Sequence, residues 1–388
     1  MSARFCFTFA VQSQAVLMGW QMYELTHDPL QLGLIGLAAA IPALSLSLIA
    51  GYLIDRINPL RAYQTVIAFS FCSVVIAFFA KTPADLYLAA VITGFMRSFT
   101  SPAMNSLVPK LVTRDELRHA SAYSTTANRM AVVIGPGIAG MLLGIHGYSL
   151  PYFVIMGFLF LGYISLLKVK YEYVLVPQKS KVERTPIFQE LLVGVHYVRK
   201  HPLLLSAMSL DMFAVLFGGV IALLPIYAAE ILFVGPRGLG WLRAAPAFGA
   251  ILMGFYLIKN PLKNHAGRIL LASVLGFGIC ILVFGTSKTY WISIIALACS
   301  GALDSVSMIV RGAIVQLCSP EHMRGRIGAV NSIFIGSSNE IGEFESGVAA
   351  KLLGTVPSVI FGGSMTVLTV ILVFWKAKDL RSLDLSKL

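Results

Sequence analysis

Charged side chains inside long apolar stretches are the residues of this sequence best able to do chemistry. The basic ones are Arg97, Arg129 and Arg311, and the acidic ones are Asp211, Asp304, Glu340, Glu343 and Glu345. A charge at the centre of a membrane helix costs about 2.5–3.5 kcal/mol on insertion scales, so it is rarely without a role. The acidic residues outnumber the basic ones, and desolvation disfavours an ionised carboxylate. We therefore expect a site that takes up and releases protons.

Helical spacing indicates which of these charges can act together. Asp304 and Arg311 are two helical turns apart and share one face of their helix, as do Glu340 and Glu343 in a later stretch. Two carboxylates on one turn repel when both are ionised, so we interpret Glu340 and Glu343 as proton carriers. Similar letters around Arg129 ("ANRM") and Glu340 ("SNEI") predict that these two residues pair. The alternative is that the charges only hold helices together.

The elements that must position these residues are membrane helices. The chain is 57% hydrophobic and 12% charged with a mean hydropathy of +0.79, whereas soluble domains carry about a quarter charged residues. A spanning helix needs about 20 apolar residues. We predict an all-α integral membrane protein with twelve transmembrane helices, at 4–25, 31–54, 61–81, 84–108, 120–145, 149–169, 203–228, 239–259, 268–287, 289–316, 326–352 and 356–376.

The long connection in the middle divides these helices into two groups of six. We predict an N-terminal half at 1–170, a linker at 171–202, a C-terminal half at 203–376 and a tail at 377–388. Within the linker, apolar residues at helical spacing from Ile187 to Tyr197 favour an amphipathic helix on the membrane surface.

The distribution of basic residues predicts the orientation in the membrane. If the linker is cytoplasmic, nearly all loop Lys and Arg lie on its side, and the opposite loops carry only Lys81, Arg237, Lys288 and Lys351. Cytoplasmic loops carry the excess of Lys and Arg. Both termini are thus expected in the cytoplasm, with the chain in the cell inner membrane. The net charge of +12 is then explained without a nucleic-acid partner.

The loop after the second stretch contains an acid beside a base at a helix end. It reads "GYLIDRINPLR" and holds Gly51, Asp55, Arg56 and Arg61. Such a pair can bind a neighbouring helix terminus and act as a gating latch. The alternative is a charge cluster that only sets topology.

The stretch "VVIGPGIAGMLLG" contains the letters of a dinucleotide-binding loop, Gly135-x-Gly137-x-x-Gly140. Such a loop requires a preceding strand and an acidic residue about 20 positions later, and here the surroundings are one hydrophobic helix. Small residues four apart instead allow close helix packing in lipid, and Pro136 permits a bend. We interpret the stretch as a bendable gate helix, with a plain packing helix as the alternative.

These motifs resemble those of the major facilitator superfamily. Gly51, Asp55 and Arg56 match its loop signature G-x-x-x-D-R/K-x-G-R/K-R/K, although Asn58 replaces the second glycine. Gly135-Pro136-Gly137 with Gly140 is similar to the G-P-x-x-G element of its proton-driven exporters. The stretches "MRSFTSPAMNSLVPK" and "SPEHMRGRIGAVNSIF" resemble its enterobactin-exporter-like branch. The resemblance implies two pseudo-symmetric six-helix halves, alternating access and export of siderophores or other amphipathic compounds.

Polar and aromatic residues of the predicted helices are candidates for a substrate surface. They are Gln12, Gln14, Ser98, Asn105, Phe213 and Phe217. Aromatic faces with scattered hydrogen-bonding groups suit a mixed ligand. Aromatic residues facing lipid are the alternative.

The expected function is secondary active transport of a small-molecule solute, coupled to protons, by a monomer in the bilayer. An uncoupled facilitator or lipid flippase is the alternative, and a non-transporting receptor is a third interpretation. No HExxH, GxSxG or Walker A sequence occurs, so we expect no enzyme, no cofactor and no ATP drive. The five cysteines form no CxxC pattern, so no metal site or disulfide framework is expected.

Overall fold

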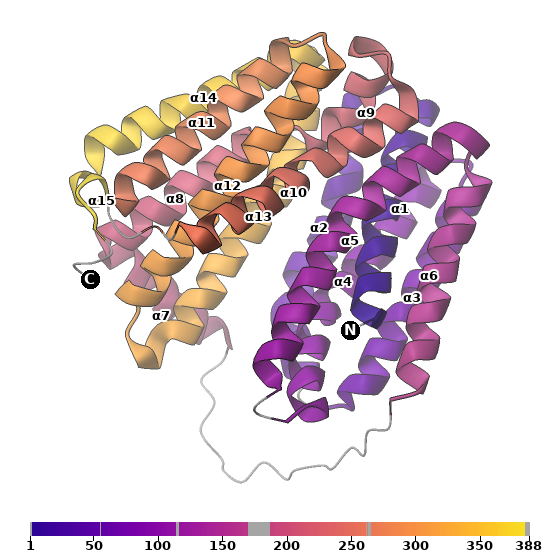
Figure 1. Cartoon of the computed structure of the whole chain (residues 1–388), viewed down its shortest axis with the longest axis horizontal. Helices are drawn as coiled ribbons and strands as arrows, with labels where there is room; N and C mark the ends of the chain where they lie inside the picture. Colours follow the sequence, from indigo (N-terminus) through magenta and orange to yellow (C-terminus); the bar gives the residue numbers. More distant parts are fainter. Residues whose placement is uncertain are drawn as a thin grey trace. The chain divides into compact units, whose positions relative to one another are not determined.

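The computed structural model describes residues 2–54, 56–113, 116–169, 187–260, 262 and 265–384 (Figure 1). Every regular element among them is helical. Contacts divide the chain into two compact units. Unit 1 comprises Met1–Gln178 and Ala222–Ala244, and unit 2 comprises Lys179–Ile221 and Ala245–Leu388.

Unit 1 is built from six long helices and a later segment of the chain. The helices are α1 (Ser2–Thr26), α2 (Pro29–Ile54), α3 (Pro59–Phe79), α4 (Pro83–Leu111), α5 (Leu117–His146) and α6 (Ser149–Leu167). Proline begins α2, α3 and α4, where its missing N–H removes no helical bond. In this unit α1 packs against α5 and α6, while α4 packs against α2 and α3. The later segment holds α9 (Leu224–Ile226), a π-helix (Tyr227–Ile231) and the first residues of α10 (Gly235–Lys259).

Unit 2 contains the remaining helices. They are α7 (Ile187–Lys200), α8 (Pro202–Phe217), the rest of α10, α11 (Ala266–Thr286), α12 (Tyr290–Cys318), α13 (Arg324–Leu353), α14 (Thr355–Lys376) and α15 (Lys378–Arg381), with a short 3₁₀ turn at Glu321–Met323. Another 3₁₀ turn, Ile221–Leu223, lies where the chain passes from unit 2 to unit 1. Helix α11 packs against α12 and α14, and α8 packs against α13 and α14. The amphipathic helix expected at 187–197 is present as α7, which packs against α13.

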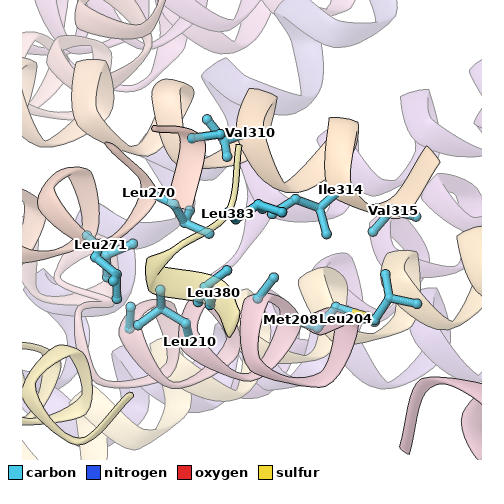
Figure 2. Close-up of a cluster of buried hydrophobic side chains, with 14 of the residues drawn as sticks. Leu204, Met208, Leu210, Leu270, Leu271, Val310, Ile314, Val315, Leu380 and Leu383 are labelled. Atoms are coloured by element: carbon cyan, nitrogen blue, oxygen red, sulfur yellow. The ribbon is translucent and has the colours of Figure 1, made fainter. Parts of the chain in front are cut away.

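Apolar side chains from several helices form the core of unit 2 (Figure 2). Leu204 and Met208 of α8, Leu270 of α11 and Ile314 of α12 are almost completely buried in it. Leu380 of α15 also lies in this cluster, so the short C-terminal helix helps to close the core. This packing holds α8, α11 and α12 together, and these three helices carry the charged site described below.

The sequence predicts one helix over 203–228, but the structure breaks this stretch into a helix and several short turns. Helix α8 ends at Phe217, and Gly218 and Gly219 precede the short turns that follow. A Cβ at Gly218 would lie only 2.5 Å from the Phe277 ring, so the chain requires glycine there. Pro225 cannot donate a helical hydrogen bond, and the chain resumes as α9 and a π-helix.

Nine helices among the described residues are long and apolar enough to cross a membrane. The other long helices, α1, α4 and α13, are less apolar, and α13 carries Arg324, Arg326, Glu340, Glu343 and Glu345. The chain is therefore an all-α, multi-pass membrane protein, and the count of twelve spans stays a prediction.

Candidate functional site

A buried ion pair joins α8 and α12 inside unit 2. The Arg311 guanidinium pairs with the Asp211 carboxylate, and the two residues are only 3% and 4% exposed. Helical periodicity had grouped Arg311 with Asp304 of its own helix, whereas the structure pairs it with Asp211. Two opposite charges in a medium of low polarity compensate each other, so the pair leaves little net charge in the core.

A small cavity lies beside this pair. Its polar lining consists of Asp211 from α8, Ser273 from α11, and Asp304 and Ser307 from α12. Ala214, Val215, Val274 and Phe277 complete the lining. Because Asp211 is already neutralised by Arg311, Asp304 supplies a further carboxyl group to a mainly apolar enclosure. The structure thus collects three of the predicted charges, Asp211, Asp304 and Arg311, in one place.

The other predicted charges lie elsewhere. Glu340 and Glu343 are half-buried on α13 in unit 2, and Glu345 of the same helix is half-buried as well. Arg97 on α4 and Arg129 on α5 belong to unit 1 and are exposed. The Arg129–Glu340 pair links residues of different units and remains a prediction.

The loop motif between α2 and α3 is described in part. Asp55 lies outside the described residues. Gly51 has open space around it, and the Arg56 guanidinium stacks 4.2 Å from the centre of the Tyr52 ring. Arg61 is exposed in the first turn of α3, where its backbone N–H donates to the Asn58 side chain at 3.3 Å. The Asn58 carbonyl group caps α3, which gives the residue replacing the family's second glycine a structural role.

The glycine-rich stretch of α5 is a close helix contact. A Cβ at Gly140 would lie 2.5 Å from the Pro236 carbonyl oxygen and 2.7 Å from the Cα atom of Gly240, at the start of α10. Gly135 approaches α1, where the Ser13 hydroxyl donates to its carbonyl oxygen at 3.0 Å. Pro136 lies inside α5 without ending it, and Gly137 has only ordinary contacts with Trp241. Small residues thus let the backbones approach closely in unit 1, while a gating role stays a prediction.

The candidate substrate residues fall into two groups. Gln14 and Ser98 are buried in unit 1 and engaged there, because the Gln14 amide donates to the Ser73 hydroxyl at 2.9 Å and Ser98 donates to the Phe95 carbonyl oxygen. The Gln14 bond joins α1 to α3, whereas the Ser98 bond lies within α4. Gln12, Asn105, Phe213 and Phe217 are exposed or half-buried, and the rings of Phe213 and Phe217 stack at 6.5 Å.

The sequence analysis did not predict several polar contacts of α1. Arg4 donates to Ser124 at 2.9 Å and Thr8 donates to Asn128 at 2.8 Å, which forms a polar row between α1 and α5. Equal helical spacing on both helices is the signal that could have revealed this row. The Tyr23 hydroxyl also donates to the Glu230 carboxylate at 2.8 Å. No local pattern predicts this bond, because Glu230 lies on a π-helix far along the chain.

Long apolar helices that carry a buried ion pair and a small cavity lined by carboxyl groups are typical of polytopic membrane transporters. A family model described as the Major Facilitator Superfamily matches residues 1–342. The chain belongs to this superfamily and is a transporter.

Similar sequences and structures agree with this assignment. The chain is 25% identical over 334 residues to the enterobactin exporter EntS of Escherichia coli O1:K1. This alignment covers 84% of this chain and 79% of that protein. The EntS protein of Escherichia coli O81 is 26% identical over the same length.

Among solved structures, a mutant of the nucleoside transporter NupG aligns with a TM-score of 0.78 and 11% identity over 97% of this chain and 98% of that one. A bacterial homologue of the human lysosomal transporter Spinster aligns with a TM-score of 0.73 and 13% identity over 98% and 95%. These structural likenesses establish the fold alone.

Proposed function

We propose that this protein exports a siderophore or another amphipathic small molecule from the cytoplasm in exchange for protons. The similarity to enterobactin exporters supports the substrate class and the direction of transport. The observation that carries the coupling is the cavity in unit 2, where Asp304 adds a carboxyl group beside the compensated Asp211–Arg311 pair. An acid with no compensating base in such a place can change its charge within the transport cycle.

Glu340 and Glu343 are the second element of this proposal. They lie one turn apart on α13 and are half-buried, so both can exchange protons with water during the cycle. Repulsion between two ionised carboxylates favours the state in which one of them carries a proton. Arg97 and Arg129 are the basic residues that a solute carrying catecholate or carboxylate groups would meet.

We further propose that residues 1–170 and 203–376 act as the two halves of an alternating-access monomer. Residues 171–202 and the tail at 377–388 would lie in the cytoplasm, and the protein in the cell inner membrane. The excess of Lys and Arg in the loops on one side supports this orientation. The close contact of Gly140 with Gly240, and the loop residues Gly51, Asp55, Arg56 and Arg61, are candidate gates.

The test is solute efflux from proteoliposomes with an imposed pH gradient, screened over catecholate siderophores and drug-like amphipathic compounds. We expect transport that increases with the gradient and collapses with a protonophore. Glu340→Gln, Glu343→Gln and Asp304→Asn should abolish the dependence on the gradient. Asp379→Asn, an exposed acid of α15, is the matched control and should behave as wild type.

The alternatives give different results in the same assay. An uncoupled facilitator or a lipid flippase would move its solute or lipid equally with and without the gradient, and the three variants would keep full activity. A non-transporting receptor would move none of the compounds. Either result would remove the proposal of proton-coupled export.

A further inference from the structure

The cavity in unit 2 has features that proton exchange alone does not require. Ser307 of α12 is 2% exposed, its hydroxyl oxygen has no hydrogen-bond partner, and its side chain lines the cavity beside Asp304. A buried hydroxyl without a partner is unfavourable, because it has lost its hydrogen bonds to water and gained none in the protein. Its position beside two carboxyl groups at this cavity indicates that an occupant completes its bonding.

The other polar side chains of the lining also offer oxygen atoms that can coordinate a cation. Asp211 and Asp304 contribute carboxylates, and Ser273 keeps acceptor capacity because its hydroxyl donates to the Ile269 carbonyl oxygen at 2.8 Å. The described residues that line the cavity include no side chain with a nitrogen or sulfur ligand. Because every polar side chain of the lining offers oxygen, these groups suit a hard cation rather than a transition metal.

The charge at the site fits a cation of one positive charge. Arg311 compensates Asp211, which leaves Asp304 as the one uncompensated acid among the lining residues. A divalent ion would need a second uncompensated acid, which the lining lacks, and no cluster of three or more His, Cys, Asp or Glu side chains suited to a metal ion occurs among the described residues. The cavity is also too small for an organic solute, with room for roughly one water-sized sphere.

The end of α8 adds to the negative potential there. Ala214 and Val215, in the last turn of α8, line the cavity, and the helix ends at Phe217. The C-terminal end of a helix carries a partial negative charge, and interrupted membrane helices place such ends at ion sites. Phe277, which also lines the cavity, packs at the position of Gly218, so the break in α8 lies next to the site.

We propose that this cavity binds one Na⁺ ion, coordinated by Asp304, Ser307 and Asp211 with Ser273 nearby. The bound ion neutralises Asp304 and joins α8, α11 and α12. The site goes beyond the proposed proton-coupled export, since Na⁺ binding needs neither the solute nor a pH gradient.

Thermal unfolding of the purified full chain in detergent tests this site. NaCl replaces choline chloride at constant ionic strength, KCl serves as a second cation, and binding of radioactive Na⁺ is measured in parallel. We expect a saturable rise in melting temperature with Na⁺ and a smaller one with K⁺, because a ligand that binds the folded state stabilises it. Bound radioactive Na⁺ should saturate over the same concentrations.

Two variants and one control separate a specific site from general effects. Ser307→Ala should weaken the apparent affinity for Na⁺ about tenfold, the loss expected for one bond to a charged group. Asp304→Asn should abolish the Na⁺ effect. Ser293→Ala removes another buried, unpartnered hydroxyl of α12 that does not line the cavity, and it should leave the Na⁺ response unchanged.

Other results overturn the site. Equal responses to Na⁺ and choline, or equal losses in Ser307→Ala and Ser293→Ala, exclude it. The protein could instead melt at a higher temperature at low pH, show no response to Na⁺, and lose the effect of low pH in Asp304→Asn. This result would mean that the cavity binds only a proton, and it would be consistent with proton-coupled export. Saturable Na⁺ binding by a protein that exports none of the compounds would retain the site and remove the proposed function.

Discussion

Removal of one partner from the Asp211–Arg311 pair should strongly destabilise unit 2, whereas removal of both should cost much less. Both residues are less than 5% exposed, so water cannot solvate the charge that a single substitution leaves behind. Breaking a buried ion pair on one side costs about 3–5 kcal/mol, while neutral replacement of both partners is often tolerated. We therefore expect Asp211→Asn and Arg311→Gln each to lose about 3–5 kcal/mol of unfolding free energy.

The double variant Asp211→Asn/Arg311→Gln should recover a large part of this loss. The interaction energy from the double-mutant cycle should exceed the loss of either single variant, at about 3–5 kcal/mol or more, because each single variant leaves an uncompensated buried charge that the double variant lacks. Equilibrium unfolding in mixed detergent micelles measures all four proteins. A buffer with choline in place of Na⁺ keeps cation binding at the neighbouring cavity out of the comparison.

The exposed Asp379→Asn serves as the control, since a surface substitution of this kind changes stability by about 0.5 kcal/mol or less. If both single variants lie within about 1 kcal/mol of wild type, the pair is not a buried charge contact. If the double variant loses the sum of the two single losses, the two residues do not interact in the folded protein. Either result would refute the placement of this ion pair.

Further substitutions test three contacts in unit 1. Gly140→Leu should abolish folding or transport, because its Cβ alone would lie 2.5 Å from a carbonyl oxygen of α10. Gly137→Ala is the control and should be tolerated, because the nearest atom to its Cβ lies at 3.9 Å. Expression level and efflux compare the two variants, and equal behaviour would contradict the close contact at Gly140. Gln14→Leu should lower stability by about 1 kcal/mol and leave the KM for solute unchanged, since its amide bonds within the helix packing; a raised KM with unchanged melting would restore its predicted role at the substrate. Tyr23→Phe removes a hydrogen bond to the Glu230 carboxylate and should cost about 1.5–3 kcal/mol in the same unfolding assay; an unchanged unfolding free energy would show that the bond does not hold the π-helix to α1.

Much of the fold follows from the sequence because a membrane helix needs a continuous apolar run. The predicted runs other than the one at 203–228 coincide with long helices, and α7 lies where amphipathic spacing predicted a helix. The break after Phe217 was not predicted, since hydropathy averages over Gly218 and Gly219. Crowding by Phe277, from another helix, is what makes glycine necessary there.

The sequence by itself determined which residues are chemically notable: the acids and bases within apolar runs, and the small residues of α5. Only the tertiary structure decided their partners. Arg311 pairs with Asp211 of α8 rather than with Asp304 of its own helix, and Gln14 bonds to Ser73 within the packing. The physical reason is that periodicity reports only which side chains share a helix face. A partner from another helix is chosen by how helices distant in sequence pack, because each buried polar group must find compensation among the groups that packing brings near it.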